Sequence, residues 1–413
     1  MNRRELFKAG AGAAFLGGEG LGGHARPHTL WQDEVRAAFP RVTGQHFVNA
    51  AAGTPLGTFA EAGIRRYTDF QKLGPGQGRG DYVQEMLANI RGAFARLIGA
   101  GESEIALVHC TKQGEQIVID GLDPIRNGGN IVTNDLHFSG SLHNLVGLRN
   151  AGVDVRVVKN RDWNISAEAM ISAIDDETKL VAITLISNVN GRIEPVRALA
   201  DAAHAHGAYV YADVIQAAGI FPFDVRELGI DFAAANGYKW LYGVHGSGFL
   251  YVREDLQGTA LRDRLFPGHV QPTYPPWMGE RDPGQPDFLY EAPTDARRYE
   301  PGHHSYLGYC AVYEGIRFIE RVGVNNALEH SVRLNGRIKG RVDPDRYTCI
   351  SPDVDRSPII TLASSQTQPV ETTLRNANVV VSLLGNGRIR ISPAVYNTEQ
   401  DIDVLIDALN STP

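Results

Sequence analysis

The sequence predicts an α/β fold: a mainly parallel sheet with helices on both faces, followed by a small α+β C-terminal domain. Apolar strand-like runs alternate with helix-like segments from residue 104 onward, which is typical of a parallel sheet wrapped by helices. The run 179–185 is almost continuously apolar, as expected for a strand covered on both faces. The expected strands of this sheet are 105–109, 130–133, 153–158, 179–185, 208–212, 232–235 and 248–252.

The alternation ends after residue 252, and the C-terminal third has a different order of elements. From about residue 307 two helices precede strand-like runs at 358–362, 379–383 and 388–391, and a helix at 398–409 closes the chain. We therefore expect a large domain at 46–296 and a small domain built from 29–45 and 297–413.

The composition indicates a soluble globular protein with a large core. Of the 413 residues 43% are apolar, and the mean hydropathy is -0.21. The net charge of -7 without a long basic run argues against nucleic acid as a partner. Three scattered cysteines fit neither a disulfide framework nor a zinc site, so we expect no bound metal.

The N-terminus differs from the rest of the chain. Arg3 and Arg4 precede a stretch of small, weakly apolar residues, which is similar to a twin-arginine export signal. We expect residues 1–28 to direct export, which makes the mature protein periplasmic. The alternative is a Gly-rich leader with a chance arginine pair on a cytoplasmic protein. No other segment reaches the roughly 18 apolar residues of a membrane span.

Two charged residues follow neighbouring strands of the predicted sheet. The run 208–212 ends in Asp213, and the run 232–235 leads to Lys239. In such a sheet ligands bind outside the carboxyl ends of the strands, so both side chains should face one crevice. Pyridoxal phosphate is held by a lysine as a Schiff base, and a carboxylate keeps its ring nitrogen protonated. Alternatively, Asp213 is a helix cap and Lys239 is solvated.

The residues around this pair carry a family resemblance. Asp213 and Gln216 fall in an Asp-x-x-Gln-Ala pattern, and Lys239 lies in a Tyr-Lys-Trp segment followed by two glycines. This stretch resembles the class V aminotransferases, the fold-type I pyridoxal-phosphate family that includes cysteine desulfurases, kynureninase and isopenicillin-N-epimerase-like proteins. The resemblance implies that Gln216 bonds the phenolic oxygen of the cofactor. It also places Asn236 where the family has a Ser or Thr that touches the phosphate.

Two further segments are expected at the cofactor phosphate. A helix begins after strand 105–109, and free N–H groups at a helix N-terminus bind phosphate. Gln113 and Gly114 stand there in place of the Gly-Thr-Thr usual in the family, although Gly114 also fits an ordinary helix start. The segment 297–304 is similar to the family's Arg-Phe-Glu-x-Gly-Thr, which reaches the phosphate of the neighbouring subunit. His303 occupies the Thr position.

The resemblance assigns four more residues. His137 would stack on the cofactor ring, although a histidine at a strand end is also common as a capping or surface residue. Asn188 would bond the phenolic oxygen or the substrate carboxylate. Asn49 matches the segment that passes under the site, and a simple turn residue is the alternative. Arg390 matches the arginine that binds the substrate α-carboxylate, for which a guanidinium fork is suited.

These assignments predict a pyridoxal-phosphate enzyme that acts at Cα or Cβ of an amino-acid or peptide substrate, as an aminotransferase or a lyase. Lys239 would hold the cofactor and then transfer a proton at Cα. The loop 382–387 before Arg390 contains no cysteine, which argues against cysteine desulfuration. The alternatives are an epimerase and an inactive binding protein on the same fold. The family's site lies at a subunit boundary, so the resemblance implies a homodimer.

Overall fold

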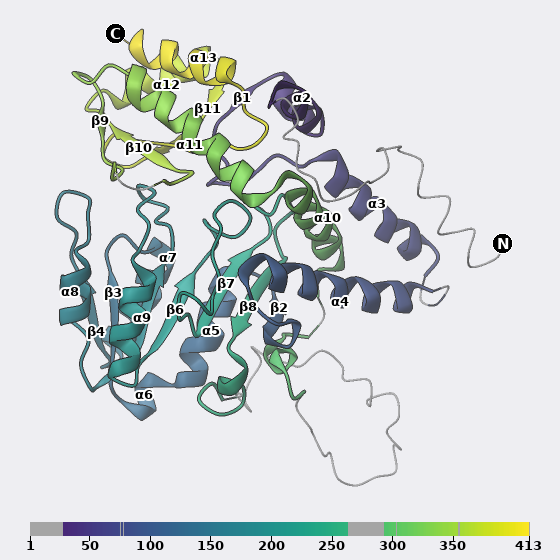
Figure 1. Ribbon diagram of the computed structural model, residues 1–413, viewed down its shortest axis with the longest axis vertical. Helices are drawn as coiled ribbons and strands as arrows, with labels where there is room; N and C mark the ends of the chain where they lie inside the picture. The colour runs from purple at the N-terminus through teal and green to yellow at the C-terminus, as the bar shows by residue number, and fades with distance from the viewer. Residues whose placement is uncertain are drawn as a thin grey trace.

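The computed structural model describes residues 28–74, 76, 78–262, 293–302, 304–353 and 356–412. Figure 1 shows a large α/β lobe below a smaller lobe that contains the C-terminus. All of the expected export signal except its last residue lies outside the described residues, and so does His303. None of the described helices is long and apolar enough to cross a membrane.

A seven-stranded sheet forms the centre of the large lobe, in the order β2-β8-β7-β6-β5-β3-β4. All of its neighbouring pairs are parallel except those of β8, which is antiparallel to both β2 and β7. The predicted mainly parallel sheet is confirmed. Its strands are β2 (Ile105–Val108), β3 (Asn130–Asn134), β4 (Asp154–Val158), β5 (Thr178–Thr184), β6 (Tyr209–Asp213), β7 (Phe232–Asn236) and β8 (Gly248–Val252).

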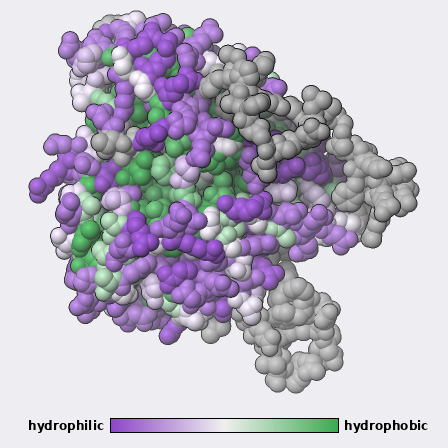
Figure 2. Space-filling view, in the orientation of Figure 1, coloured by the Kyte–Doolittle hydropathy of each residue, from purple (hydrophilic) through white to green (hydrophobic). Residues whose placement is uncertain are grey.

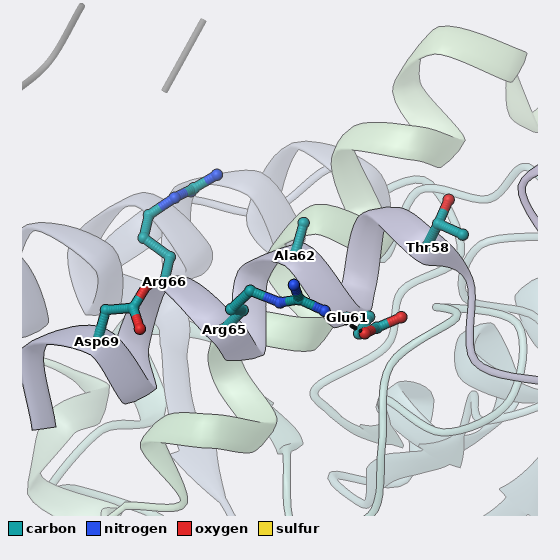
Figure 3. Close-up of a pocket in the computed structure, with 6 residues that line it drawn as sticks. All are labelled: Thr58, Glu61, Ala62, Arg65, Arg66 and Asp69. Atoms are coloured by element: carbon teal, nitrogen blue, oxygen red, sulfur yellow. Dashed lines mark hydrogen bonds and ion pairs between the residues drawn. The ribbon is translucent and has the colours of Figure 1, made fainter. Parts of the chain in front are cut away.

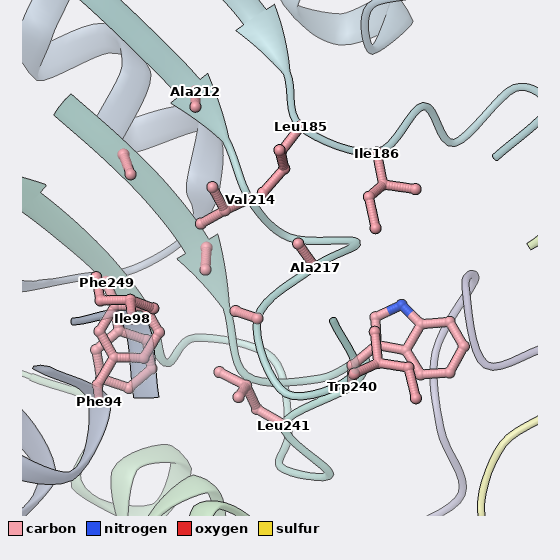
Figure 4. Close-up of a cluster of buried hydrophobic side chains, with 14 of the residues drawn as sticks. Phe94, Ile98, Leu185, Ile186, Ala212, Val214, Ala217, Trp240, Leu241 and Phe249 are labelled. Atoms are coloured by element: carbon pink, nitrogen blue, oxygen red, sulfur yellow. The ribbon is translucent and has the colours of Figure 1, made fainter. Parts of the chain in front are cut away.

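Helices cover both faces of this sheet because alternate strand residues are apolar on both sides. In β6, Val210 and Ala212 face one core while Tyr211 faces the other. Figure 4 shows the first core, where Ala212 and Val214 lie near Leu185 and Ala217. The helices of the large lobe are α3 (Thr58–Lys72), α4 (Arg79–Ile98), α5 (Thr111–Leu122), α6 (Pro124–Asn127), α7 (Ser139–Asn150), α8 (Ala167–Ser172), α9 (Val196–Ala205) and α10 (Tyr306–Val322).

Helix α5 lies closer to the sheet than an ordinary residue at its first turn would allow. A Cβ atom at Gly114 would lie 2.8 Å from the Cβ atom of Ala234 on β7. Real Cβ atoms do not approach so closely, and interiors of this density do not give way easily. Gly114 therefore brings the first turn of α5 against the middle of β7.

The smaller lobe has its own antiparallel sheet, in the order β12-β13-β10-β9, and its own apolar core. A parallel pair, β1 (His46–Phe47) with β11, joins the start of the chain to this lobe. The domain boundary expected from the sequence assigns His46–Phe47 to the large domain, whereas these two residues pair with β11 of the smaller lobe. The other elements are α2 (His28–Ala37), α11 (Val324–Arg341), β9 (Thr348–Cys349), β10 (Ile360–Ala363), α12 (Thr367–Asn376), β11 (Val379–Val380), β12 (Ser382–Leu384), β13 (Arg388–Ile391) and α13 (Glu399–Asn410).

The start of the described chain is tied to the last helix through a buried carboxylate. Asp401 on α13 accepts a hydrogen bond from Nη1 of Arg36 (2.7 Å) and lies 2.7 Å from Nδ1 of His46. Burial raises the pKa of Asp401, but the hydrogen bond from the backbone N–H of Thr398 and the contacts with Arg36 and His46 outweigh it and lower the pKa below its usual value. On the face shown in Figure 2, apolar residues gather in the band between the polar surfaces of the two lobes.

Candidate active site

Lys239 and Asp213 lie at the carboxyl edge of the sheet, as predicted. Asp213 is the last residue of β6, and Lys239 follows the end of the adjacent strand β7 by three residues. Asp213 is only 3% exposed and Lys239 only 8% exposed. The Asp213 carboxylate accepts one hydrogen bond, from the backbone N–H of Ile215 (3.0 Å).

Burial dominates the electrostatics of this pair. It lowers the pKa of Lys239 to about 8, an effect that Arg390 reinforces and Asp213 opposes. Burial also raises the pKa of Asp213 to about 6, although the hydrogen bond from Ile215 and the charge of Lys239 both favour the carboxylate. An amine with such a pKa is partly neutral near pH 7, which a nucleophilic or basic lysine requires.

Arg390 belongs to β13 of the small lobe and lies near enough to Lys239 to affect its pKa. Its Nη1 donates to the backbone carbonyl of Asn188 (3.0 Å), and its Nη2 donates to Oγ of Ser382 (3.0 Å). Burial lowers the pKa of Arg390 to about 10. Ser382 in turn donates to Oδ1 of Asn49 (2.8 Å). The structure thus brings Asn49, Asn188 and Arg390 together, as predicted, and adds Ser382, which the sequence did not single out.

His137 lies fully inside the site. It is 1% exposed, and neither of its ring nitrogens has a hydrogen-bond partner among the described residues. Burial lowers its pKa to about 4, so the ring is neutral at ordinary pH. Oε1 of the buried Glu115 lies 4.0 Å from its Nε2. A neutral ring without hydrogen bonds suits the stacking role, which stays a prediction.

Glu115 is a buried carboxylate that the sequence reading passed over. It forms an ion pair with Lys112, and Oγ of Ser141 donates to its Oε2 (2.8 Å). Lys112 and Glu115 are three residues apart in the first turns of α5, the spacing at which helical side chains meet. This spacing is the one feature of the sequence that could have indicated a paired Glu115. It did not indicate burial, because exposed ion pairs on helices have the same spacing.

Gln216 already has protein partners for both ends of its amide. Its Nε2 donates to the carbonyl of Ala51 (3.0 Å), and its Oε1 accepts from Nε1 of Trp240 (2.9 Å). The indole of Trp240 lies within the apolar cluster shown in Figure 4. One hydrogen of Nε2 remains for the predicted bond to a cofactor oxygen, so this assignment stays a prediction.

Of the residues expected at the phosphate, Gln113, Gly114 and Asn236 lie around the start of α5. Oε1 of Gln113 accepts from the backbone N–H of His109 (2.7 Å), so its side chain closes the turn before the helix. Nδ2 of Asn236 lies 3.5 Å from the carbonyl oxygen of His109, a long contact. The phosphate roles of Gln113, Gly114, Asn236 and His303 stay predictions.

Several residues of this site carry buried polar atoms that have no hydrogen-bond partner among the described residues. A buried polar atom without a hydrogen bond lowers the stability of a folded protein, and a bound ligand often supplies the missing partner. The donors among them, Oγ1 of Thr111 and Nε of Arg390, would find acceptors on an anionic group, which fits the phosphate of the predicted cofactor and the carboxylate of an amino-acid substrate. Within the described part of the chain the buried polar atoms without a partner include Oγ1 of Thr111, Oε1 of Glu115, both ring nitrogens of His137, Oδ1 of Asn188, Oδ1 of Asn236 and Nε of Arg390.

A separate surface hollow of about 460 Å³ lies along α3. Figure 3 shows its charged side chains, with Glu61 paired to Arg65 at 2.6 Å. Both side chains are more than half exposed, so the pair contributes little. None of the predicted site residues lines this hollow.

Several known proteins are similar in sequence to this chain. A probable cysteine desulfurase of Methanothermobacter thermautotrophicus is 28% identical over 316 residues, which cover 75% of each chain. A cysteine desulfurase of Escherichia coli is also 28% identical, over 79% of this chain and 82% of its own. The uncharacterized aminotransferase YcbU of Bacillus subtilis is 24% identical, over 77% of this chain and 82% of its own.

Solved structures share the fold at lower identity. The apo cysteine desulfurase of Thermococcus onnurineus NA1 superposes with a TM-score of 0.78 at 20% identity, over 92% of this chain and 97% of its own. The cystine C–S lyase C-DES, in complex with cysteine persulfide, superposes with a TM-score of 0.79 at 19% identity, over 91% of this chain and 99% of its own. The profile of the aminotransferase class-V family matches residues 75–405. The predicted resemblance and fold class are confirmed, and the chain belongs to the aminotransferase class-V family.

Proposed function

We propose that the protein is a pyridoxal-phosphate enzyme that acts at Cα or Cβ of an amino-acid substrate, as a lyase or an aminotransferase. The observation that carries this proposal is the buried Lys239, whose pKa is lowered to about 8, beside Asp213 and opposite Arg390. An enzyme of this class is consistent with the family match. Pyridoxal 5′-phosphate is the cofactor, since the family match and a C-DES variant that carries glycine linked to the PLP cofactor both support it.

When bound, the cofactor withdraws electrons from the Cα atom of an amino acid joined to it. Lys239 in its neutral form would supply the nucleophile that holds the cofactor, and the same amine would move a proton at Cα. The Asp213 carboxylate stabilises a positive charge on the ring nitrogen. Arg390 binds the substrate carboxylate, and His137 presents a flat, neutral face to the ring.

We further propose that the protein is not a cysteine desulfurase, although several relatives bear that name. That reaction needs a mobile thiol, and the hairpin 382–387 has none. Cys110 caps α5, Cys310 is buried in α10, and Cys349 lies on β9. Elimination at Cβ needs only a base at Cα and a leaving group, and this is the reaction class of a C–S lyase such as C-DES.

Product analysis of the holoenzyme tests the reaction class. The protein would be incubated with amino acids that carry a leaving group at Cβ, such as L-cystine, with Lys239→Ala as the control. Release of pyruvate and ammonia indicates elimination, whereas amino transfer to an added 2-oxo acid indicates an aminotransferase. Inversion at Cα alone indicates the epimerase alternative. Formation of L-alanine from added L-cysteine, with one persulfide formed on a protein cysteine, would contradict our exclusion of desulfuration. No reaction with any substrate favours the binding-protein alternative.

We also propose a homodimer and export to the periplasm through residues 1–28. Sedimentation of the mature protein tests the first, and a mass corresponding to one chain would contradict it. Cell fractionation of the wild type and of a double Arg3→Lys, Arg4→Lys variant tests the second, because twin-arginine export depends on the arginine pair. Equal periplasmic amounts of both proteins would contradict this route.

A further inference from the structure

Three side chains form a hydrogen-bonded relay that runs from Arg390 on β13 through Ser382 on β12 to Asn49. Nη2 of Arg390 donates to Oγ of Ser382 (3.0 Å), and Ser382 donates to Oδ1 of Asn49 (2.8 Å). We propose that Ser382 is the positioning residue that holds Arg390 for the substrate carboxylate, and that Asn49 acts through Ser382 rather than on the substrate. This inference rests on the role proposed above for Arg390.

The direction of the relay follows from the chemistry of its members. A guanidinium group can only donate, so Ser382 must accept from Arg390 and use its single hydrogen elsewhere. That hydrogen goes to Oδ1 of Asn49, which can only accept. Ser382 and Arg390 are register partners on the antiparallel strands β12 and β13, so their side chains leave the same face of the sheet.

Arg390 is held from both lobes. The carbonyl of Asn188 in the large lobe accepts from Nη1, while Ser382 in the small lobe accepts from Nη2. These two bonds use only two of the five N–H donors of the guanidinium group. A long, charged side chain that is 6% exposed needs such partners, and fixing it before binding reduces the entropy lost when a carboxylate is captured.

Asn49 is held in place by backbone contacts with the small lobe. Its backbone forms a parallel bridge with Ser392, just beyond β13, and the N–H of Ala50 donates to the carbonyl of Ser392 (3.0 Å). Its Oδ1 is satisfied by Ser382. The backbone therefore fixes Asn49 beside the strand that carries Arg390, and its side chain points to Ser382. This assigns to Asn49 a different role from the substrate contact expected from the sequence.

The test uses two aminooxy reagents that would displace the Lys239 amine from the cofactor in the holoenzyme and form an oxime at the carbon that the lysine held. Aminooxyacetate carries a carboxylate, whereas O-methylhydroxylamine does not. The ratio of their reaction rates, followed by the change in visible absorption, measures carboxylate recognition without knowledge of the natural substrate. We expect Arg390→Ala to abolish the preference for aminooxyacetate, and Ser382→Ala to lower it about tenfold, as expected for a lost hydrogen bond to a charged group. Ser382→Thr should retain it.

A double-mutant cycle separates the two roles of Asn49. If Asn49 acts through Ser382, Asn49→Ala lowers the preference in the wild type and has no further effect in the Ser382→Ala protein. Additive losses would overturn this part of the proposal, because they indicate a direct contact with the ligand. Ser364→Ala is a matched control, since this hydroxyl accepts from the N–H of Gln366 instead. Thermal melting of each variant shows whether it is folded.

The outcomes distinguish this inference from the proposed function. An unchanged preference in folded Ser382→Ala, with a lost preference in Arg390→Ala, overturns the relay alone. An unchanged preference in Arg390→Ala overturns the carboxylate role of Arg390 and the relay with it. A preference that falls in Ser382→Ala and is restored in Ser382→Thr supports the relay.

Discussion

Burial makes Lys239 a stronger nucleophile near neutral pH, and replacing its charged neighbours should shift its titration in opposite directions. Its pKa falls from 10.5 to about 8, a difference of about 3 kcal/mol between the two protonation states. At about pH 7.5 roughly a quarter of the amine is then neutral, compared with about one part in a thousand for an ordinary lysine. Arg390→Met removes a repelling cation and should raise the pKa of Lys239. Asp213→Asn removes an attracting carboxylate and should lower it further.

Reductive methylation of the cofactor-free protein measures this titration, because only the neutral amine reacts. The rate at Lys239 would be followed by peptide mass spectrometry from about pH 6 to about pH 11. The exposed Lys72 in the same digest serves as the internal reference. A Lys239 rate that rises only near the ordinary value of 10.5, or variants that shift in the same direction, would refute the argument from burial.

Three more variants test the site and the fold. Asp213→Asn should still bind the cofactor through Lys239, but turnover should fall at least about a hundredfold because the ring charge is no longer stabilised; equal turnover would contradict this role. Gly114→Ala should destabilise the protein by about 1–3 kcal/mol in urea unfolding, since α5 cannot approach β7; a wild-type midpoint would contradict the packing argument. Asp401→Asn should cost about 2 kcal/mol through lost contacts with Arg36 and His46. The folded-state pKa of Asp401 is lowered, so its contribution is present above the unfolded value of about 3.9 and is lost as the pH falls below it. The Asp401→Asn protein should therefore not lose this contribution to its free energy of unfolding between about pH 6 and about pH 3, as unfolding curves recorded at each pH would show.

The parts of the site that lie at strand ends were predictable from the sequence. Asp213 and Lys239 follow apolar runs, and neighbouring parallel strands share one carboxyl edge, so the fold class alone places them together. Arg390 and Asn188 were found through family motifs, and the structure joins them by a hydrogen bond.

Contacts set by strand register and tertiary packing were not predictable. Ser382 meets Arg390 because β12 and β13 pair in one particular register, which the alternation of residue types does not encode. The amide of Gln216 is held by Ala51 and Trp240, which lie far apart in the chain. The pairing of β1 with β11 likewise joins segments more than 300 residues apart, so a boundary drawn from local composition could not reveal it.

The visible absorption spectrum of the purified protein with added pyridoxal phosphate tests the central claim most directly. We predict an absorption band that borohydride removes, with the cofactor then fixed to Lys239 in the peptide map, and no such band in Lys239→Ala. A protein that stays colourless, or a Lys239→Ala variant with the same band and the same borohydride-stable label, would contradict the assignment of Lys239 and the function built on it.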